Sequence, residues 1–315
     1  MKLICGPMAT ISHPAFRILV EQFGGCDEYY TEMINAGTLI TNGPFEKYYI
    51  DPTPCPEKLV WQIIGKNEEL TTLAVKQIAE LPGIGIDINM GCPVKKVAGR
   101  GAGAGILKDI PKMIAITDAI VKKSKLPVTV KTRIGYEETN KPIVEVAERL
   151  QDVGVQALSI HGRTKTQMYK GDADWTLIGK VKENPRMIIP IFGNGDVTSA
   201  EVALEKKNRY GVDGILIGRG AIGNPWIFEQ TKRVISGLPQ REIPIAERVE
   251  VCKKHLFAAI EWKGERTAIM EMRKHYGGYF KGIPDFKQFR IPLVTYSTLD
   301  ELLPIFTDIV NYYSD

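Results

Sequence analysis

The sequence predicts an α/β fold: a parallel (β/α)8 barrel, or TIM barrel, over residues 1–237, followed by a small all-helical domain over residues 238–315. Three observations predict this arrangement. Eight short apolar or β-branched runs recur up to residue 220, helix-like stretches separate them, and polar residues follow nearly every run. A doubly wound sheet is the alternative, but it usually shows one early glycine-rich fingerprint rather than polar residues at nearly every strand end.

The predicted strands are mostly apolar without strict alternation, as expected for strands that are buried on both faces. In order along the chain they are KLICG (2–6), CDEYYTE (26–32), LVWQIIG (59–65), GIGIDINMG (83–91), PVTVKTRIG (127–135), ALSIHGR (157–163), PIFGNGD (190–196) and GILIGRG (214–220). Apolar residues at helical spacing predict intervening helices at 67–80, 109–123, 142–153, 174–182 and 199–208.

The pattern changes after Leu238, where LPQREIPI has the composition of a linker. Helical patterns follow at 247–262, 265–281 and 299–312, and no convincing strand pattern accompanies them. Residues 263–290 hold seven Lys or Arg against three acids, whereas residues 291–315 hold four acids and no Lys or Arg. A local basic patch is therefore expected in the helical domain.

Composition excludes several classes of protein. The chain has 315 residues, a formal net charge of +4 and 44% hydrophobic residues, which is typical of a globular protein rather than a disordered one. No apolar run is long enough for a membrane helix and the first residues do not resemble a signal peptide, so a cytoplasmic location without membrane contact is expected. Five cysteines without a CxxC pair and four scattered histidines predict neither disulfides nor a metal site.

In a parallel barrel the active site lies at the C-terminal ends of the strands. Polar side chains embedded there cost free energy unless they are paired, so a barrel with only a structural role would not need them. The residues at these ends are Pro7, Met8 and Ala9; Thr31 and Glu32; Gln62; Asn89 and Cys92; Lys131 and Arg133; His161 and Arg163; Asn194, Gly195 and Asp196; and Gly218 and Arg219.

The last two runs end in GNGD (193–196) and IGRG (217–220). Glycine turns leave backbone N–H groups free to bind an anion near a helix N-terminus. Each glycine pair alone is more often a tight turn, but the two together, after the seventh and eighth strands, favour a phosphorylated ligand.

Lys131 and His161 each allow two interpretations. A lysine in a barrel strand can form a Schiff base, or it can be a fixed positive charge that tunes a cofactor ring. A lone histidine in a strand is usually a satisfied core residue, but the position of His161 in HGR at a strand end favours a ligand contact.

Cys92 is the predicted catalytic residue. Most lone cysteines are inert and behave as small hydrophobic residues. This one follows a strand end and precedes a glycine-rich loop that carries Lys95, Lys96 and Arg100. Such surroundings favour either a thiolate or a thiol that is positioned as a proton donor.

Several motifs together resemble the tRNA-dihydrouridine synthases. They are GPMA (6–9), the Gln of WQIIG, DINMGCPVKKV (87–97), RGAGAGIL (100–107), TVKTRIG, SIHGRT, FGNGDV and IGRGAIGNPWIF. Their order and spacing extend over roughly residues 4–230, and MRKHYGGYFKGIP (272–284) resembles the helical tRNA-binding domain of that family.

This resemblance implies an enzyme that uses FMN and NADPH (or NADH) to reduce the C5=C6 bond of uridine in tRNA, and we expect it to be a monomer. Cys92 would donate a proton to C5 while reduced flavin delivers hydride to C6. The residues implied to bind FMN are Pro7, Met8, Ala9, Gln62, Lys131, His161, Asn194, Gly195, Asp196, Gly218 and Arg219. Those expected to contact tRNA or its uridine are Asn89, Arg133, Lys95, Lys96, Arg100, Arg273 and Lys274.

The chain departs from the family pattern at two places. The first motif commonly reads PMAGVTD-x-PFR, whereas this chain has Thr10 in place of the glycine and His13 in place of the acid. Gly277 and Gly278 make the C-terminal motif richer in glycine than usual, which is expected to loosen that helix.

Two other functions compete with this interpretation. A flavin barrel that acts on a small free pyrimidine, similar to dihydroorotate or dihydropyrimidine dehydrogenases, also keeps Asn and Cys or Ser near the ring. Such an enzyme has no need of RKHYGGYFKG, although that segment alone is equally typical of a solvated amphipathic helix. A non-redox RNA-binding protein would not need an intact Cys92, Lys131 and His161.

Overall fold

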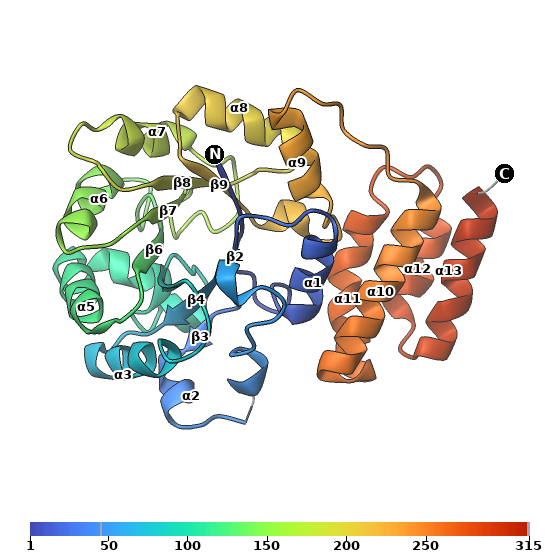
Figure 1. Cartoon of the computed structure of the whole chain (residues 1–315), viewed down its shortest axis with the longest axis horizontal. Coiled ribbons are helices and arrows are strands. Elements are labelled where there is room, and N and C mark those ends of the chain that lie inside the picture. Colours follow the sequence, from blue (N-terminus) through green and yellow to red (C-terminus); the bar gives the residue numbers. More distant parts are fainter. Residues whose placement is uncertain (45, 314–315) are drawn as a thin grey trace.

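The computed structural model describes residues 1–44 and 46–313 and shows a closed parallel barrel beside a bundle of helices (Figure 1). Among these residues the barrel strands are β1 (Lys2–Cys5), β2 (Glu28–Tyr30), β4 (Leu59–Ile64), β5 (Gly85–Met90), β6 (Val128–Arg133), β7 (Leu158–His161), β8 (Ile191–Asn194) and β9 (Gly214–Ile217). Pairings of β1 with β9 and of β2 with β4 close the sheet. The predicted TIM barrel is confirmed. The additional strand β3 (Ile34–Asn35) lies outside the prediction because two residues are too short to form a pattern.

Helices surround the barrel (Figure 1). They are α1 (Pro14–Gln22), α2 (Ala36–Ile40), α3 (Glu68–Ile78), α4 (Lys95–Ala98), α5 (Ile110–Lys123), α6 (Ile143–Asp152), α7 (Trp175–Glu183), α8 (Ala200–Tyr210) and α9 (Ile227–Ile235), with 3₁₀ turns at Glu46–Tyr48, Pro56–Lys58, Gly103–Lys108 and Arg219–Ala221. The five predicted helices correspond to α3, α5, α6, α7 and α8. α1 lies outside the predicted helices; six of its nine residues are buried, and α10 packs against it.

Side-chain caps mark the starts of the predicted helices α3, α5, α7 and α8, whereas α6 begins after Pro142 without one. The Asn67 side chain accepts a hydrogen bond of 2.9 Å from the Leu70 N–H, and the Asp109 side chain accepts one of 3.1 Å from the Lys112 N–H. Ser199 caps α8 in the same way. These bonds satisfy backbone donors that the first turn of a helix leaves unpaired.

The two-residue period of a strand decides which side chains enter the barrel. One buried apolar cluster contains Ile4, Tyr30, Val60, Ala157, Phe192 and Leu216. Val60 of β4 and Phe192 of β8 point inward. Two residues further along the same strands, Gln62 and Asn194 lie on the same face and are polar. The barrel interior therefore combines this apolar cluster with a buried polar layer, in which Gln62 also bonds Asp87, beneath the C-terminal mouth.

The C-terminal helices α10 (Ile245–Lys263), α11 (Glu265–Tyr279), α12 (Lys287–Thr295) and α13 (Leu299–Tyr313) form a bundle beside the barrel (Figure 1). α10, α11 and α13 correspond to the predicted helices, whereas α12 is short and contains Pro292. The bundle has its own hydrophobic core, which Leu19 of α1 and Trp226 also join. No described helix combines the length and apolar character that a membrane crossing needs.

Gly278 allows α11 to lie directly against the barrel. A Cβ atom at this position would lie 1.9 Å from the Ile222 carbonyl oxygen and 2.9 Å from the Gly223 Cα, so only glycine lets the two backbones approach. At the same contact, the Gly223 N–H donates a hydrogen bond of 3.1 Å to His275 Nδ1. The glycine pair therefore does not loosen the helix as expected: α11 continues through it, and one glycine permits close packing.

Gly278→Ala is expected to lower the free energy of unfolding by about 1–3 kcal/mol, because the new methyl group would overlap the Ile222 carbonyl. Gly277→Ala is the matched control, since nothing lies within 4 Å of its Cβ position and alanine favours a helix. Denaturant unfolding of both variants measures the difference. Equal stability of the two variants would contradict the close contact.

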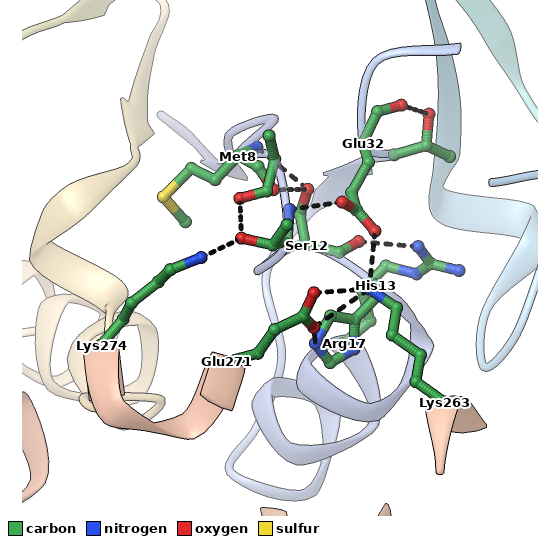
Figure 2. A network of polar contacts seen from close by, with 11 residues as sticks. Met8, Ser12, His13, Arg17, Glu32, Lys263, Glu271 and Lys274 are labelled. Carbon is green, nitrogen blue, oxygen red and sulfur yellow. Dashed lines mark hydrogen bonds and ion pairs between the residues drawn. The ribbon is translucent and has the colours of Figure 1, made fainter. Parts of the chain in front are cut away.

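A polar network joins the loop after β1 to α10 and α11 (Figure 2). The Thr10 N–H donates a hydrogen bond to Glu32, and the Lys274 amine donates one to the Thr10 hydroxyl. The Lys263 amine lies 3.9 Å from Glu32 and 3.1 Å from Glu271, so one cation lies between two carboxylates. Because Glu32 follows a barrel strand and Glu271 belongs to α11, this network ties the bundle to the loop at the barrel mouth.

Both residues that depart from the family pattern lie in this network. Thr10 adopts a φ of 60°, a conformation that glycine reaches more easily, and its hydrogen bonds hold it there. His13 Nε2 lies 4.0 Å from Glu271 Oε2. Burial, with Lys263 acting in the same direction, lowers the pKa of His13 well below 6.5. The ring is therefore neutral at neutral pH.

Candidate active site at the barrel mouth

A cavity of about 1100 Å³ opens at the C-terminal ends of the strands, between the barrel and α11. Its volume reaches the upper end of the range for small-ligand sites. The predicted site residues on its lining are Pro7, Met8, Ala9, Asn89, Cys92, Lys131, Arg133, His161, Asn194, Gly195, Asp196, Gly218, Arg219 and Lys274. Most of the residues that sequence reasoning selected therefore surround one space.

Gln62 lies beneath this lining rather than on it. Its amide nitrogen donates to Asp87 at 2.8 Å, and its amide oxygen accepts from Asn89 at 2.8 Å. Burial raises the pKa of Asp87 to about 7, against the hydrogen bonds from Gln62 and Thr129 and the charge of Lys131. Gln62 is fully buried and supports the cavity floor, and its predicted contact with FMN stays a prediction.

Asn89 positions the start of the loop that carries Cys92. Its side-chain oxygen accepts hydrogen bonds from the N–H groups of Gly91 at 3.2 Å and of Cys92 at 2.9 Å. The Cys92 carbonyl accepts a third bond, of 3.0 Å, from the Ala104 N–H. The backbone on which the thiol stands is therefore held from two sides, and the predicted contact between Asn89 and uridine stays a prediction.

The Cys92 thiol lies on the cavity lining, and the residue is 9% exposed. Burial raises its pKa above the ordinary value of 9.0, although the Val94 N–H and the charges of Arg133 and Lys131 act in the opposite direction. The thiol is therefore neutral at neutral pH. A reactive thiolate would need a lowered pKa, so these surroundings favour a proton donor.

Lys131 presents its amine to the cavity at the end of β6. Its Nζ donates to Asn194 Oδ1 at 3.1 Å, and Asn194 Nδ2 donates to the Leu216 carbonyl at 2.8 Å. Burial lowers the pKa of Lys131 to about 8, with Arg133 acting in the same direction and Asp87 against it. The charged form still predominates at pH 7, which suits a fixed positive charge better than a nucleophilic amine.

Arg133 holds the loop after β7 against the barrel mouth. Its Nε donates to the Gly91 carbonyl at 2.8 Å, and its Nη1 donates to the carbonyls of Thr164 and Met168 at 2.8 and 2.9 Å. Burial lowers the pKa of Arg133 to about 10, so the side chain stays charged. Nη2 has no hydrogen-bond partner among the described residues, which leaves one donor group for a ligand.

His161 places a neutral ring at the end of β7. Burial and the nearby charges of Lys131, Arg133, Arg163 and Arg219 lower its pKa well below 6.5. Arg163 Nη1 lies 3.4 Å from His161 Nε2 and can only donate, so Nε2 accepts and the ring proton resides on Nδ1. The predicted contact of this ring with a cofactor stays a prediction.

Asp196 organises the ends of β8 and β9. Its carboxylate accepts hydrogen bonds from Arg163 Nη2 at 2.7 Å, from the Ala173 N–H at 2.8 Å and from Arg219 Nη2 at 3.2 Å. Burial would raise the pKa of Asp196, but the bonds from Arg163 and Ala173 hold it below 3.8. A carboxylate repels a phosphate, so the Asp196 side chain is suited to orienting Arg219, and the predicted contact of Asp196 with FMN stays a prediction.

The same end of the cavity has the features of an anion site. The Arg219 side chain is 50% exposed. The backbone N–H groups of residues 196–198 have no hydrogen-bond acceptor among the described residues. A Cβ atom at Gly218 would meet nothing closer than Met8 Sδ at 3.8 Å, so the backbone there borders open space. Free N–H groups beside an arginine suit a phosphate.

Four of the predicted RNA contacts lie outside the cavity lining. Lys95, Lys96 and Arg100 are exposed on and just after α4, close in sequence to Cys92. Arg273 is half-buried and donates to carbonyls at the end of α12, at 3.2 and 3.0 Å. Arg273 therefore braces the helical bundle, and its predicted contact with RNA stays a prediction.

Tyr169, Arg248 and Lys281 are among the lining residues that were not predicted as site residues. Lys281 was recognisable only as part of a basic segment, and nothing in the sequence places Arg248 of α10 beside a barrel loop. No group of three or more His, Cys, Asp or Glu side chains within the described residues could hold a metal ion.

Comparison with known proteins identifies the relatives of this chain. The family model described as dihydrouridine synthase (Dus) matches residues 3–310. A probable tRNA-dihydrouridine synthase of Rickettsia conorii is 34% identical over 291 residues, which cover 91% of this chain and 87% of that protein. The tRNA-dihydrouridine synthase B of Pseudomonas putida is 35% identical over 291 residues, which cover 91% and 85%.

Among solved structures, a 2-naphthoyl-CoA reductase complex matches with a TM-score of 0.52 and 10% sequence identity, covering 76% of this chain and 50% of that one. This likeness concerns the fold alone. The family model, by contrast, extends from β1 into α13 and includes both the Cys92 loop and the helical bundle. The chain therefore belongs to the dihydrouridine synthase family, a family of flavin-dependent oxidoreductases.

Proposed function

We propose that this chain reduces the C5=C6 bond of a uridine in tRNA to 5,6-dihydrouridine, with FMN as cofactor and NADPH as reductant. The observation that carries the proposal is the neutral Cys92 thiol on the lining of a cavity between the barrel and the helical bundle. Family membership and the names of the relatives, which are tRNA-dihydrouridine synthases, support tRNA as the substrate.

The residues at the ends of β6, β8 and β9 fit FMN. The unpaired N–H groups of residues 196–198 and the half-exposed Arg219 suit its phosphate. The charged Lys131 amine suits the polar edge of the flavin ring. Residues 7–9, which follow β1, line the same cavity. When bound, FMN would supply hydride to C6 of the uracil, with NADPH as the source of electrons.

Cys92 would supply the proton that C5 requires. Its raised pKa keeps the proton on Sγ, and Asn89 holds the backbone beneath it at 2.9 Å. Arg133 and Lys131 favour the thiolate that remains after the transfer, because their charges are of opposite sign. Protonation of Sγ from solvent then restores the thiol.

A uridine in RNA can enter the cavity only if its base is no longer stacked on the neighbouring bases. A base within folded RNA must be extruded before chemistry can occur at the bottom of a cavity. The side of the cavity formed by the bundle carries Arg248, Lys274 and Lys281, and such cations bind phosphates. We propose that the RNA lies across the junction of barrel and bundle, with exposed Lys95 and Lys96 near its backbone.

Mass spectrometry of tRNA tests this function in cells. We expect tRNA from cells that lack the chain to have lost dihydrouridine, and we expect the wild-type chain to restore it. Unchanged dihydrouridine in those cells, with no restoration in a strain deficient in the modification, would reject tRNA as the substrate. Reduction of a free pyrimidine by the purified chain would then favour the small-substrate alternative.

A further inference from the structure

The cavity contains an aromatic side chain to which neither the family motifs nor the proposed reaction gives a role. Tyr169 lies on the lining, in the loop between β7 and α7, and is 50% exposed. The Arg219 guanidinium lies 4.7 Å from the centroid of its ring, and that of Arg133 lies 5.7 Å away. The ring is thus close to both the arginine at the end of β6 and the arginine at the end of β9.

The backbone on both sides of Tyr169 is held in place. Arg133 Nη1 donates to the Met168 carbonyl at 2.9 Å, and Arg163 Nε donates to the Lys170 carbonyl at 3.2 Å. Met168 itself turns the chain in the left-handed region, with a φ of 53°. An exposed aromatic ring on a backbone that is already ordered loses little conformational freedom when it binds a ligand.

We propose that the Tyr169 ring is a stacking surface for the base of the uridine that enters the cavity. This inference rests on the proposed function. An exposed ring face binds a nucleobase by stacking, whatever the base. The two guanidinium groups at the ring fix its position and add positive charge next to the nucleotide. Tyr169 is therefore a substrate-positioning residue, whereas Cys92 remains the proton donor.

Kinetics with unmodified tRNA tests the stacking. Tyr169→Leu is expected to raise the KM for tRNA about tenfold to a hundredfold, the effect of losing one base–aromatic stack. Tyr169→Phe keeps the ring and should stay within about twofold of wild type. FMN content, thermal unfolding and the rate of FMN reduction by NADPH without RNA should be equal in all three proteins.

Tyr136→Leu is the matched control. The Tyr136 ring also lies near two cations, with Lys108 Nζ 4.5 Å and Lys165 Nζ 5.2 Å from its centroid, but it does not line the cavity. Its loss should leave the KM for tRNA unchanged. A rise equal to that of Tyr169→Leu would assign the effect to aromatic rings near cations in general and overturn the inference.

Three further results would overturn it. An unchanged KM for tRNA in Tyr169→Leu would show that the ring does not stack on the base. An equal rise of the KM in Tyr169→Phe would assign the effect to the hydroxyl group. Loss of FMN affinity with an unchanged KM assigns the ring to the cofactor. The two proposals fail in different ways: a wild-type chain that forms no dihydrouridine rejects the function and this inference with it, whereas an active wild type with an unaffected Tyr169→Leu rejects the stacking alone.

Discussion

Replacing Cys92 by alanine is expected to slow the reduction of uridine in tRNA by about 10²–10⁴-fold, the contribution of a positioned general acid. Burial raises the pKa of the thiol above 9.0, so the wild-type enzyme has a proton to donate at neutral pH and the variant has none. FMN content and tRNA affinity should remain unchanged, because Asn89 holds the loop through backbone N–H groups. Single-turnover assays of dihydrouridine formation measure the effect.

Cys55→Ala is the control for this experiment, because Cys55 is a partly exposed thiol that does not line the cavity. Its rate should equal that of wild type. The wild-type rate should also fall as the pH rises through the raised thiol pKa, above 9.0, because the donor is then deprotonated. Equal turnover by Cys92→Ala and wild type would exclude Cys92 as the donor.

Lys131→Met is expected to weaken FMN binding about tenfold to a hundredfold, because a hydrogen bond from a charged donor contributes about 1.5–3 kcal/mol. Methionine keeps an unbranched side chain of similar length but removes the charge. Since burial lowers the pKa of Lys131 to about 8, wild-type affinity should fall as the pH rises through that value. Titration of the apoprotein with FMN measures both effects.

The variant should show no such fall near pH 8, since it lacks the titrating amine. Lys112→Met removes an exposed lysine on the outside of the barrel and should keep both the affinity and its pH dependence. If Lys131→Met bound FMN as tightly as wild type, the cofactor ring would have to lie away from the end of β6.

The barrel and most of its mouth were within reach of sequence reasoning because their signals are local. Each strand is a short apolar run with polar residues at its end, as Gln62 and Asn194 show, so neighbouring residues alone indicate both the strand and its C-terminal end. The prediction of Cys92 as a site residue depended only on its position just after such a strand.

Other features depend on contacts between distant segments. Gln62 lies beneath the lining because its side chain bonds Asp87 and Asn89 of β5. Arg273 lies against the bundle because it donates to a carbonyl at the end of α12. Gly278 resembles a helix breaker in isolation, and only the Ile222 carbonyl beside it explains the glycine. Tyr169 carries no periodic signal, because its loop is fixed by hydrogen bonds from Arg133 of β6 and from Arg163 of the same loop.

The most direct test of the account is to incubate the purified, FMN-loaded chain with NADPH and unmodified tRNA in deuterated water, and then to analyse the digested tRNA by mass spectrometry. The account predicts dihydrouridine that carries deuterium at C5, because the Cys92 thiol exchanges its proton with solvent, and it predicts almost none from Cys92→Ala. Absence of dihydrouridine from the wild-type reaction, or an equal yield from Cys92→Ala, would contradict it.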